Sequence, residues 1–214
     1  MNSQPREKTS TGRPSWVTYR QTIGDRSELF AAIAQTWAPV RALYPGCYLD
    51  ISPSTAIPSV TYVDIDRRAA RYFANHELVA AELQGRTRVG IEPAIRFLHA
   101  DYASALDLTE ADFDLLISLY AGPLWDHCAR YLKPNGLFLA NVSHGDASLA
   151  ALDPRLDLVA AVHHDGDRYR LDTDTLDSYL IPKKPTAAKP DTIRREGRGI
   201  AYTRGAFAYL FQRT

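Results

Sequence analysis

The sequence predicts an α/β fold, a doubly wound and mostly parallel sheet with helices on both faces and an antiparallel C-terminal hairpin. Apolar strand-like segments alternate with helical patterns along most of the chain, which is typical of βαβ units. The run 113–119 is almost continuously apolar, as expected for a strand buried on both faces of a parallel sheet. Near the end, Asp165-Gly166 separates two strand-like segments and predicts a hairpin turn.

In the first half, the pattern predicts one helix, two strands and a second helix. Ser27 begins a helix whose apolar face contains Phe30 and Trp37, and Pro39 ends it. We expect strands at 40–44 and 60–63 and a helix over 67–84. The segment 46–59 contains several prolines, so little regular helix is expected there.

The second half continues the alternation. Its predicted strands are 95–98, 113–119, 137–142, 156–163, 168–171 and 206–211. Helices are expected over 124–132 and 146–152, and Lys133-Pro134-Asn135-Gly136 has the composition of a turn.

Composition narrows the functional classes. The 214 residues are 45% hydrophobic, and 25 basic residues balance 25 acidic ones, which disfavours nucleic acid and membrane surfaces as partners. No apolar run approaches the roughly 18 residues of a membrane span. We expect residues 1–14 to be a polar, flexible N-terminal arm without a secretory signal, and 15–214 to be a single domain. Cys47 and Cys128 lack metal-ligand spacing, so we expect reduced thiols, a cytoplasmic location and no metal.

One spacing indicates a nucleotide site. The strand-like run 60–63 leads directly into Asp64, which follows the Pro-Gly turn at Gly46 by 18 residues. Nucleotide-binding α/β folds place about this distance between the first glycine turn and an acid that binds a ribose hydroxyl. The spacing therefore predicts an adenosine-type ligand at the carboxyl ends of the first two strands.

Four stretches make the chain resemble the class I S-adenosylmethionine-dependent methyltransferases from about residue 29 onward. Residues 60–66 resemble the family's second strand with its ribose-binding acid, and 97–101 the third strand with the Asp that meets the adenine amino group. Residues 113–119 are similar to the fourth strand, and 131–139 to the turn before the fifth. The resemblance implies a seven-stranded sheet whose last two strands are antiparallel, S-adenosylmethionine as cofactor, and a small-molecule substrate.

The resemblance also implies a set of cofactor contacts. These are Tyr44, Gly46, Asp64, Ile65, Asp101, Tyr102 and Ser118. For three acids the residues also allow a local role. Asp64 and Asp66 could be helix-start acids that the positive end of the following helix dipole stabilises, and Asp101 could cap a turn.

The first loop departs from the family pattern, because Gly46 is followed by Cys47, Tyr48 and Leu49 where further glycines are usual. These side chains would lie where the cofactor's methionine part belongs. Asp50 or Ser52 could replace the missing polar contacts by a different route. Two functions therefore remain, a small-molecule methyltransferase and a catalytically silent methyltransferase-like binding or assembly module. Another nucleotide-dependent enzyme fits poorly, since no glycine-rich turn leads directly into a helix.

Two residues are candidates for catalysis. Tyr120 follows the fourth strand, at the edge where ligands bind, although it could simply pack with a wet hydroxyl. His144 could act as a general base or be an ordinary loop residue before a helix. His163 and His164 are poor metal ligands, because neighbours on a strand point to opposite faces.

The segment 182–199 carries an excess of Lys and Arg. It could be a lid over an anionic substrate, a contact for acidic partners, or a solvated loop. It contains no aromatic residues interleaved with the charge, which disfavours nucleic acid. The sequence leaves open the methyl acceptor, the catalytic base, the oligomeric state and whether 47–54 admits the cofactor.

Overall fold

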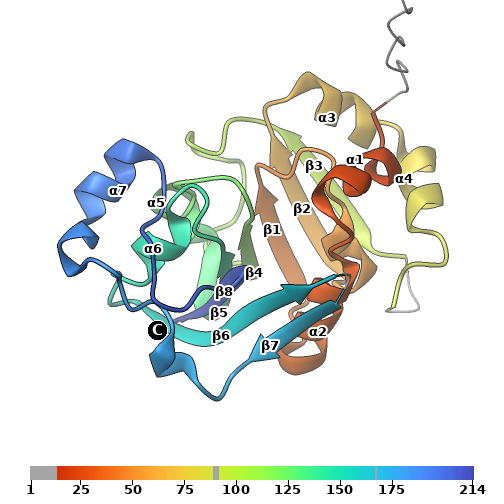
Figure 1. The fold of residues 1–214 in the computed structure, drawn as a ribbon. Helices are drawn as coiled ribbons and strands as arrows, with labels where there is room; N and C mark the ends of the chain where they lie inside the picture. The colour runs from red at the N-terminus through yellow and green to blue at the C-terminus, as the bar shows by residue number, and fades with distance from the viewer. Residues whose placement is uncertain (1–13, 89–91, 167) are drawn as a thin grey trace, which may run out of the picture.

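A single eight-stranded sheet runs through the molecule, with helices on both faces (Figure 1). The computed structural model describes residues 14–88, 92–166 and 168–214, so the predicted arm lies outside the described residues except for Pro14. The strands are β1 (Arg41–Pro45), β2 (Ser59–Asp64), β3 (Ala94–His99), β4 (Phe113–Ser118), β5 (Leu132–Ala140), β6 (Leu156–Asp165), β7 (Arg168–Asp172) and β8 (Ala208–Arg213).

The strand order is β3-β2-β1-β4-β5-β8-β6-β7. Strands β1 to β5 pair in parallel, and β8 lies antiparallel between β5 and β6. The doubly wound, mostly parallel sheet is therefore confirmed, but the expected count of seven strands is wrong. After the Asp165-Gly166 turn the chain folds back on β6 as β7, which adds an eighth strand at the sheet edge.

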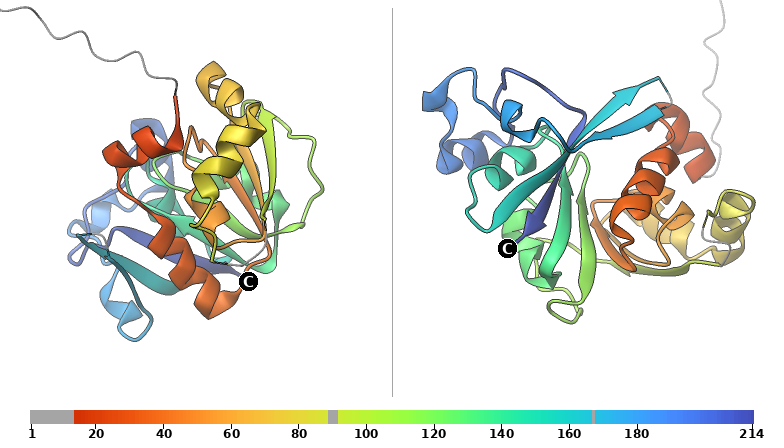
Figure 2. Two further views of the ribbon diagram at one scale, coloured as in Figure 1. Left: turned by 90° about the vertical axis from the view of Figure 1, so that its right-hand side faces the viewer. Right: turned by 90° about the horizontal axis from the view of Figure 1, so that it is seen from below.

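The helices form two layers, which the right-hand view of Figure 2 separates. One hydrophobic cluster packs α1 to α4 on one face of the sheet, and the other packs α5 and α6 on the opposite face, with α7 outside α6. The helices are α1 (Trp16–Ile23), α2 (Ser27–Trp37), α3 (Arg67–Phe73), α4 (His76–Leu83), α5 (Trp125–Cys128), α6 (Asp146–Ala150) and α7 (Pro190–Glu196). Short 3-10 turns are η1 (Ser52–Thr55), η2 (Ala129–Tyr131), η3 (Leu176–Ser178) and η4 (Pro185–Ala187). Among the described residues no helix is both long and apolar enough to cross a membrane.

Several predicted elements differ in detail. The helix expected over 67–84 is two helices, because the Asn75 side chain accepts from the Leu78 N–H and starts a new helix there. The turn expected at 133–136 lies inside β5, where the register shifts and Asn135 takes a φ of 62°. The sequence did not predict α1 or α7.

The connection from β1 to β2 contains no α-helix, as its prolines predicted. Instead η1 is completely buried, and Leu49 and Ile51 are part of the core. The carboxylate of Asp50 holds this connection in place. Its Oδ2 accepts from the guanidinium of Arg26 at 2.8 Å and from the Tyr44 hydroxyl at 3.2 Å, and its Oδ1 accepts from the Ser52 N–H.

We expect Arg26→Met to lower the free energy of unfolding by about 3–5 kcal/mol, because it leaves the Asp50 carboxylate buried without its cation. Urea denaturation measures the loss. Arg88→Met is the matched control, since it breaks the exposed pair with Glu28 and should cost about 1 kcal/mol or less. Similar losses in the two variants would contradict the role of the buried pair.

Candidate functional site

A pocket lies where the strand order reverses. Strand β1 pairs with β2 on one side and with β4 on the other, and in open α/β sheets ligands bind at the carboxyl ends of such strands. The pocket there measures about 410 Å³. It is lined by Tyr19, Thr22, Ile23, Arg26, Tyr44, Gly46, Cys47, Leu119 and Tyr120. One wall therefore comes from α1, the helix that the sequence did not predict.

A larger hollow of about 1130 Å³ lies elsewhere, between α4 and β3. Its lining reaches Thr87 and Glu92, on either side of residues 89–91, which the structure does not describe. It is also remote from the reversal of strand order. We therefore assign the candidate site to the smaller pocket.

Gly46 allows the loop after β4 to approach the carboxyl end of β1 closely. Its φ is 67°, and a Cβ there would lie 2.7 Å from the Cβ of Ala121 and 3.7 Å from the ring of Tyr102. Any side chain at this position would push the two loops apart. The structure thus brings together two predicted contact residues, Gly46 and Tyr102. Both lie beside Ala121, which belongs to the chain segment that connects β4 to β5.

Asp64 ends β2 as a buried carboxylate. Its Oδ2 accepts from the Tyr48 N–H at 2.7 Å, and its Oδ1 accepts from the Asp66 N–H at 2.8 Å. A carboxylate oxygen can accept two hydrogen bonds, so each oxygen keeps one acceptor position. Asp66 is the N-cap of α3 and accepts from the Arg68 N–H, which is the local role expected for an acid at a helix start.

Ile65 and Asp101 lie beside Asp64 at the ends of β2 and β3. The Ile65 side chain is 67% exposed. Asp101 is exposed and accepts from the Ala103 N–H at 2.9 Å, so it does cap a turn. A second acceptor oxygen of this carboxylate stays available.

The side chains of the glycine-poor loop leave the pocket open. Leu49 points into the core, and Tyr48 packs edge-on against Tyr19 at 4.9 Å, so neither residue lines the pocket. Asp50 and Ser52 are buried and bonded to each other, which means that they do not supply the substitute ligand contacts considered from the sequence. Only Cys47 from this loop faces the pocket.

A second buried carboxylate fixes the loop after β4. Asp146, at the start of α6, accepts from the Ser118 hydroxyl and from the N–H groups of Leu124 and Trp125. Burial raises the pKa of the Asp146 carboxyl above its usual value. Ser118, a predicted cofactor contact, is completely buried and bonded to Asp146, and it is not part of the pocket lining.

The two catalytic candidates lie in different surroundings. Tyr120 lines the pocket with a half-exposed ring, which lies over the Arg26 guanidinium at 5.2 Å. His144 is exposed and near Gly122, outside the pocket lining. Tyr120 is therefore the one of the two that a pocket ligand would touch.

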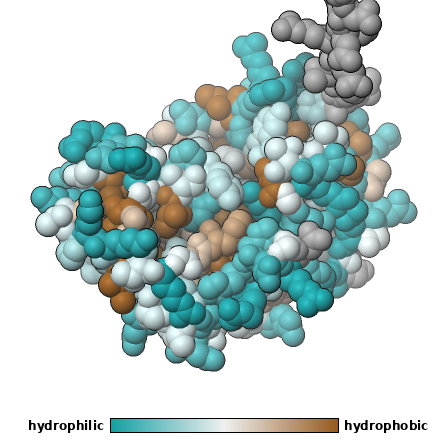
Figure 3. Space-filling model, in the orientation of Figure 1, coloured by the Kyte–Doolittle hydropathy of each residue, from teal (hydrophilic) through white to brown (hydrophobic). Residues whose placement is uncertain are grey.

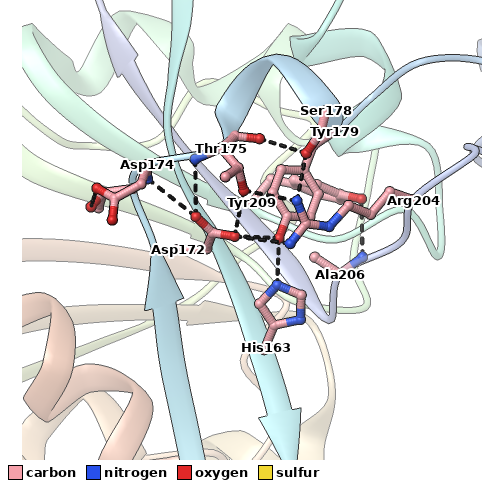
Figure 4. Close-up of polar contacts among 10 residues, drawn as sticks. His163, Asp172, Asp174, Thr175, Ser178, Tyr179, Arg204, Ala206 and Tyr209 are labelled. Carbon is pink, nitrogen blue, oxygen red and sulfur yellow. Dashed lines mark hydrogen bonds and ion pairs between the residues drawn. The ribbon is translucent and has the colours of Figure 1, made fainter.

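His163 and His164 point to opposite faces of β6, as expected. His163 Nε2 lies 2.6 Å from the Tyr179 hydroxyl, which donates to Asp172 at 2.7 Å (Figure 4). Asp172 also accepts from Arg204 at 3.0 Å. We call these four residues, His163, Asp172, Tyr179 and Arg204, the β7–β8 clasp, because they tie the end of β7 to the chain just before β8. The described residues contain no group of three or more His, Cys, Asp or Glu placed to hold a metal.

The basic segment lies between Asp172 and Arg204 in the sequence, and its helix α7 packs against α5 and α6. Within it, Arg194 of α7 forms a bidentate ion pair with Asp126 of α5, and Ile193 is buried near Gly145. Figure 3 shows apolar residues gathered toward the middle and left of the face seen in Figure 1, between hydrophilic surroundings. At least one positive charge of the segment, that of Arg194, is therefore neutralised by an ion pair with another part of the protein.

Comparison with known proteins gives structural resemblances only. Neither a protein-family model nor a curated protein sequence matches the chain. Solved structures do resemble it. The magnesium protoporphyrin IX methyltransferase of Synechocystis PCC 6803, solved with bound SAM, is 14% identical over 92% of this chain and 81% of its own, with a TM-score of 0.49. A methyltransferase from Geobacter sulfurreducens is 16% identical over 76% and 90%, with a TM-score of 0.48.

The YcgJ protein of Bacillus subtilis is 21% identical over 53% of this chain, with a TM-score of 0.41, and the match spans only 48% of YcgJ. At these identities the likeness concerns the fold alone. The strand order itself, with β8 antiparallel between β5 and β6, is that of a class I methyltransferase-like fold with one additional edge strand.

The β7–β8 clasp should contribute to stability in a pH-dependent way. Hydrogen bonds from Tyr179 and Thr175 hold the pKa of Asp172 below its usual value. A depressed carboxyl pKa stabilises the folded state above the unfolded pKa, and that contribution is lost as pH falls below about 4. Asp172→Asn should therefore be less stable than the wild type near pH 6, with a gap that narrows below about pH 4 in urea titrations. Asp174→Asn, two residues away, is the control and should keep the wild-type pH profile; a gap independent of pH would contradict the assignment.

Proposed function

We propose that the chain is an S-adenosylmethionine-dependent methyltransferase acting on a small molecule. The observation that carries the proposal is the pocket at the reversal of strand order, which opens beside Gly46 although the loop after it lacks further glycines. The family resemblance of the strand ends supports the same reading. The balanced charge and the two buried free thiols support a cytoplasmic location.

The residues present fit the cofactor. Asp64 keeps acceptor positions for ribose hydroxyls, and the exposed Ile65 offers an apolar surface to a nucleobase. The free oxygen of Asp101 suits an adenine amino group, and Gly46 lets a ligand approach the backbone. In addition, the buried Nε of Arg26, a residue that lines the pocket, has no hydrogen-bond partner in the described part of the chain. A buried donor without a partner costs free energy, which a water molecule or a polar ligand atom at this position would recover.

The bound cofactor supplies an electrophilic methyl group. The chain's own contribution is to hold the acceptor in line and to exclude water, which is the main source of rate in such positioning catalysis. Tyr120 lines the pocket and is therefore better placed than His144 to contact and orient the acceptor.

A second function, the silent methyltransferase-like module, is favoured by one observation. The protein's own backbone already uses both oxygens of Asp64, through Tyr48 and Asp66, and Ala121 lies over Gly46. In a domain that had lost its cofactor, backbone groups and neighbouring side chains would occupy the cofactor's hydrogen-bond positions and space in this way.

Calorimetric titration with S-adenosylmethionine and with S-adenosylhomocysteine distinguishes the two functions. We expect saturable binding, weakened about tenfold or more by Asp64→Ala, because a hydrogen bond to a charged group contributes about 1.5–3 kcal/mol. Ile65→Ala should also weaken binding severalfold without lowering the melting temperature, since its side chain is exposed.

Val40→Ala is the matched control, because Val40 is similarly exposed, at 56%, but precedes β1 at the opposite end of the sheet. It should leave binding unchanged. The absence of both heat and thermal shift with either ligand would exclude the methyltransferase and favour the silent module.

A further inference from the structure

Helix α1 is attached to the rest of the protein mainly at its first turn. Among its eight residues only Trp16 is buried, whereas the next helix, α2, buries three large apolar side chains. The guanidinium groups of Arg20 and Arg86 lie 5.1 and 5.7 Å from the Trp16 ring and add cation–π contacts there. An element with so few buried apolar side chains belongs to the part of a fold that opens most readily.

The carboxylate of Glu82 in α4 fastens this first turn, and Figure 1 shows α1 beside α4. It accepts from the backbone N–H groups of Trp16 at 3.0 Å and Val17 at 3.4 Å, and from the Tyr72 hydroxyl at 2.5 Å. We call these four residues, Trp16, Val17, Tyr72 and Glu82, the α1 latch. The latch is incomplete, because the buried Trp16 Nε1 has no hydrogen-bond partner in the described part of the chain. An unpaired buried donor disfavours the latched position.

The other end of α1 has the properties of a hinge. Gly24, which ends the helix, has a φ of 81° and a ψ of 160°, a combination that is essentially restricted to glycine. Apart from its chain neighbours, a Cβ there would meet no described atom within 4 Å, so the backbone rather than packing requires glycine. Just beyond it, the buried pair of Arg26 with Asp50 fixes the chain. Helix α1 therefore lies between a fixed point and a latch.

The segment between these two ends covers the candidate site. The pocket lining includes Tyr19, Thr22 and Ile23 of α1. Cys47 lines the same pocket from the loop after β1 and is only 2% exposed. Burial raises the pKa of the Cys47 thiol well above its usual value, which makes it unreactive while it is covered. A ligand in the pocket therefore contacts α1 and covers this thiol.

We propose that α1 is a lid over the pocket, which opens about Gly24 when Trp16 leaves its position beside Glu82, and which a bound ligand holds closed. The identity of that ligand, the cofactor, rests on the proposed function. The opening itself does not, because latch and hinge are built from the protein alone. The closed lid excludes water from the pocket, and the open lid admits and releases the ligand.

The Cys47 thiol measures the opening in the full chain without ligand. The test is labelling with iodoacetamide at about pH 8, where an exposed thiol is partly ionised, followed by mass spectrometry of the two cysteine peptides. Cys128 is the internal control, because it is buried in the hydrophobic cluster on the opposite face of the sheet.

We expect Cys47 to react at least about tenfold faster than Cys128, because local opening costs less free energy than global unfolding. Low concentrations of urea should leave the Cys47 rate unchanged, since a lid exposes little surface, and should accelerate Cys128. The same urea dependence for both thiols would mean that Cys47 is reached only by global unfolding, which would overturn the proposal.

Glu82→Ala tests the latch. It removes the acceptor of two backbone N–H groups, so Cys47 labelling should rise about tenfold or more and stay independent of low urea. Glu77→Ala is the matched control on the same helix, because Glu77 is exposed and lines the separate hollow between α4 and β3. It should leave the rate unchanged. An unchanged rate in Glu82→Ala would mean that the reagent reaches Cys47 with α1 in place, and would overturn the proposal.

Gly24→Ala tests the hinge. The added methyl group meets no neighbour, but the closed backbone conformation becomes strained, so Cys47 labelling should rise severalfold. Gly197→Ala is the control at the end of α7, since Gly197 has a φ of 61° and equally open space around it. It should not change the Cys47 rate. Equal rates in Gly24→Ala and the wild type would contradict the hinge.

Saturating S-adenosylhomocysteine separates the lid from the proposed function. We expect it to slow Cys47 labelling at least about tenfold, because the ligand holds α1 closed. Calorimetric binding of S-adenosylhomocysteine without any slowing would show that a bound ligand does not hold α1, and would overturn the proposal. Urea-independent labelling of Cys47 that responds to Glu82→Ala, in a protein that binds no S-adenosylhomocysteine, would reject the methyltransferase and keep the lid.

Discussion

The buried ion pair between Arg26 and Asp50 is the interaction on which the site depends. A carboxylate placed inside the β1–β2 connection must find a cation, and the cation comes from the joint between α1 and α2. Satisfying that charge brings α1 over the end of β1, where Tyr19, Thr22 and Ile23 become a pocket wall. The loop that lacks glycines is therefore compatible with a pocket because its polar residues turn inward.

A second buried carboxylate, that of Asp146, fixes the loop on the other side of the pocket. Asp146 accepts hydrogen bonds from the Ser118 hydroxyl and from two backbone N–H groups, which fixes the loop that carries Leu119 and Tyr120. Both loops that border the pocket are thus held by buried acids rather than by glycine flexibility. Walls held in this way need little reorganisation on binding, which reduces the entropic cost of capturing a ligand.

Local patterns predicted the strands and the hairpin well, because periodicity and turn residues act over a few positions. The helix α1 was missed because long-range contacts hold it. The Trp16 side chain is buried, and the Trp16 backbone N–H donates to the carboxylate of Glu82, 66 residues away. The same difference between local and long-range contacts applies to the site. The spacing of Gly46 and Asp64 predicted that both lie at the carboxyl ends of neighbouring strands. The pairing of Asp50 with Arg26 and of Ser118 with Asp146 joins residues that no local pattern connects.

The β7–β8 clasp has a consequence for how the molecule can diversify. Because Asp172 and Arg204 tie together the two ends of the intervening chain, residues 173–203 form an excursion that begins and ends at one point of the sheet. The entropic cost of lengthening such a closed excursion grows only slowly, by about 0.6 kcal/mol per doubling. The exposed parts of this excursion can therefore change in length, while the buried Ile193, the clasp residue Tyr179 and the strands beneath keep their positions.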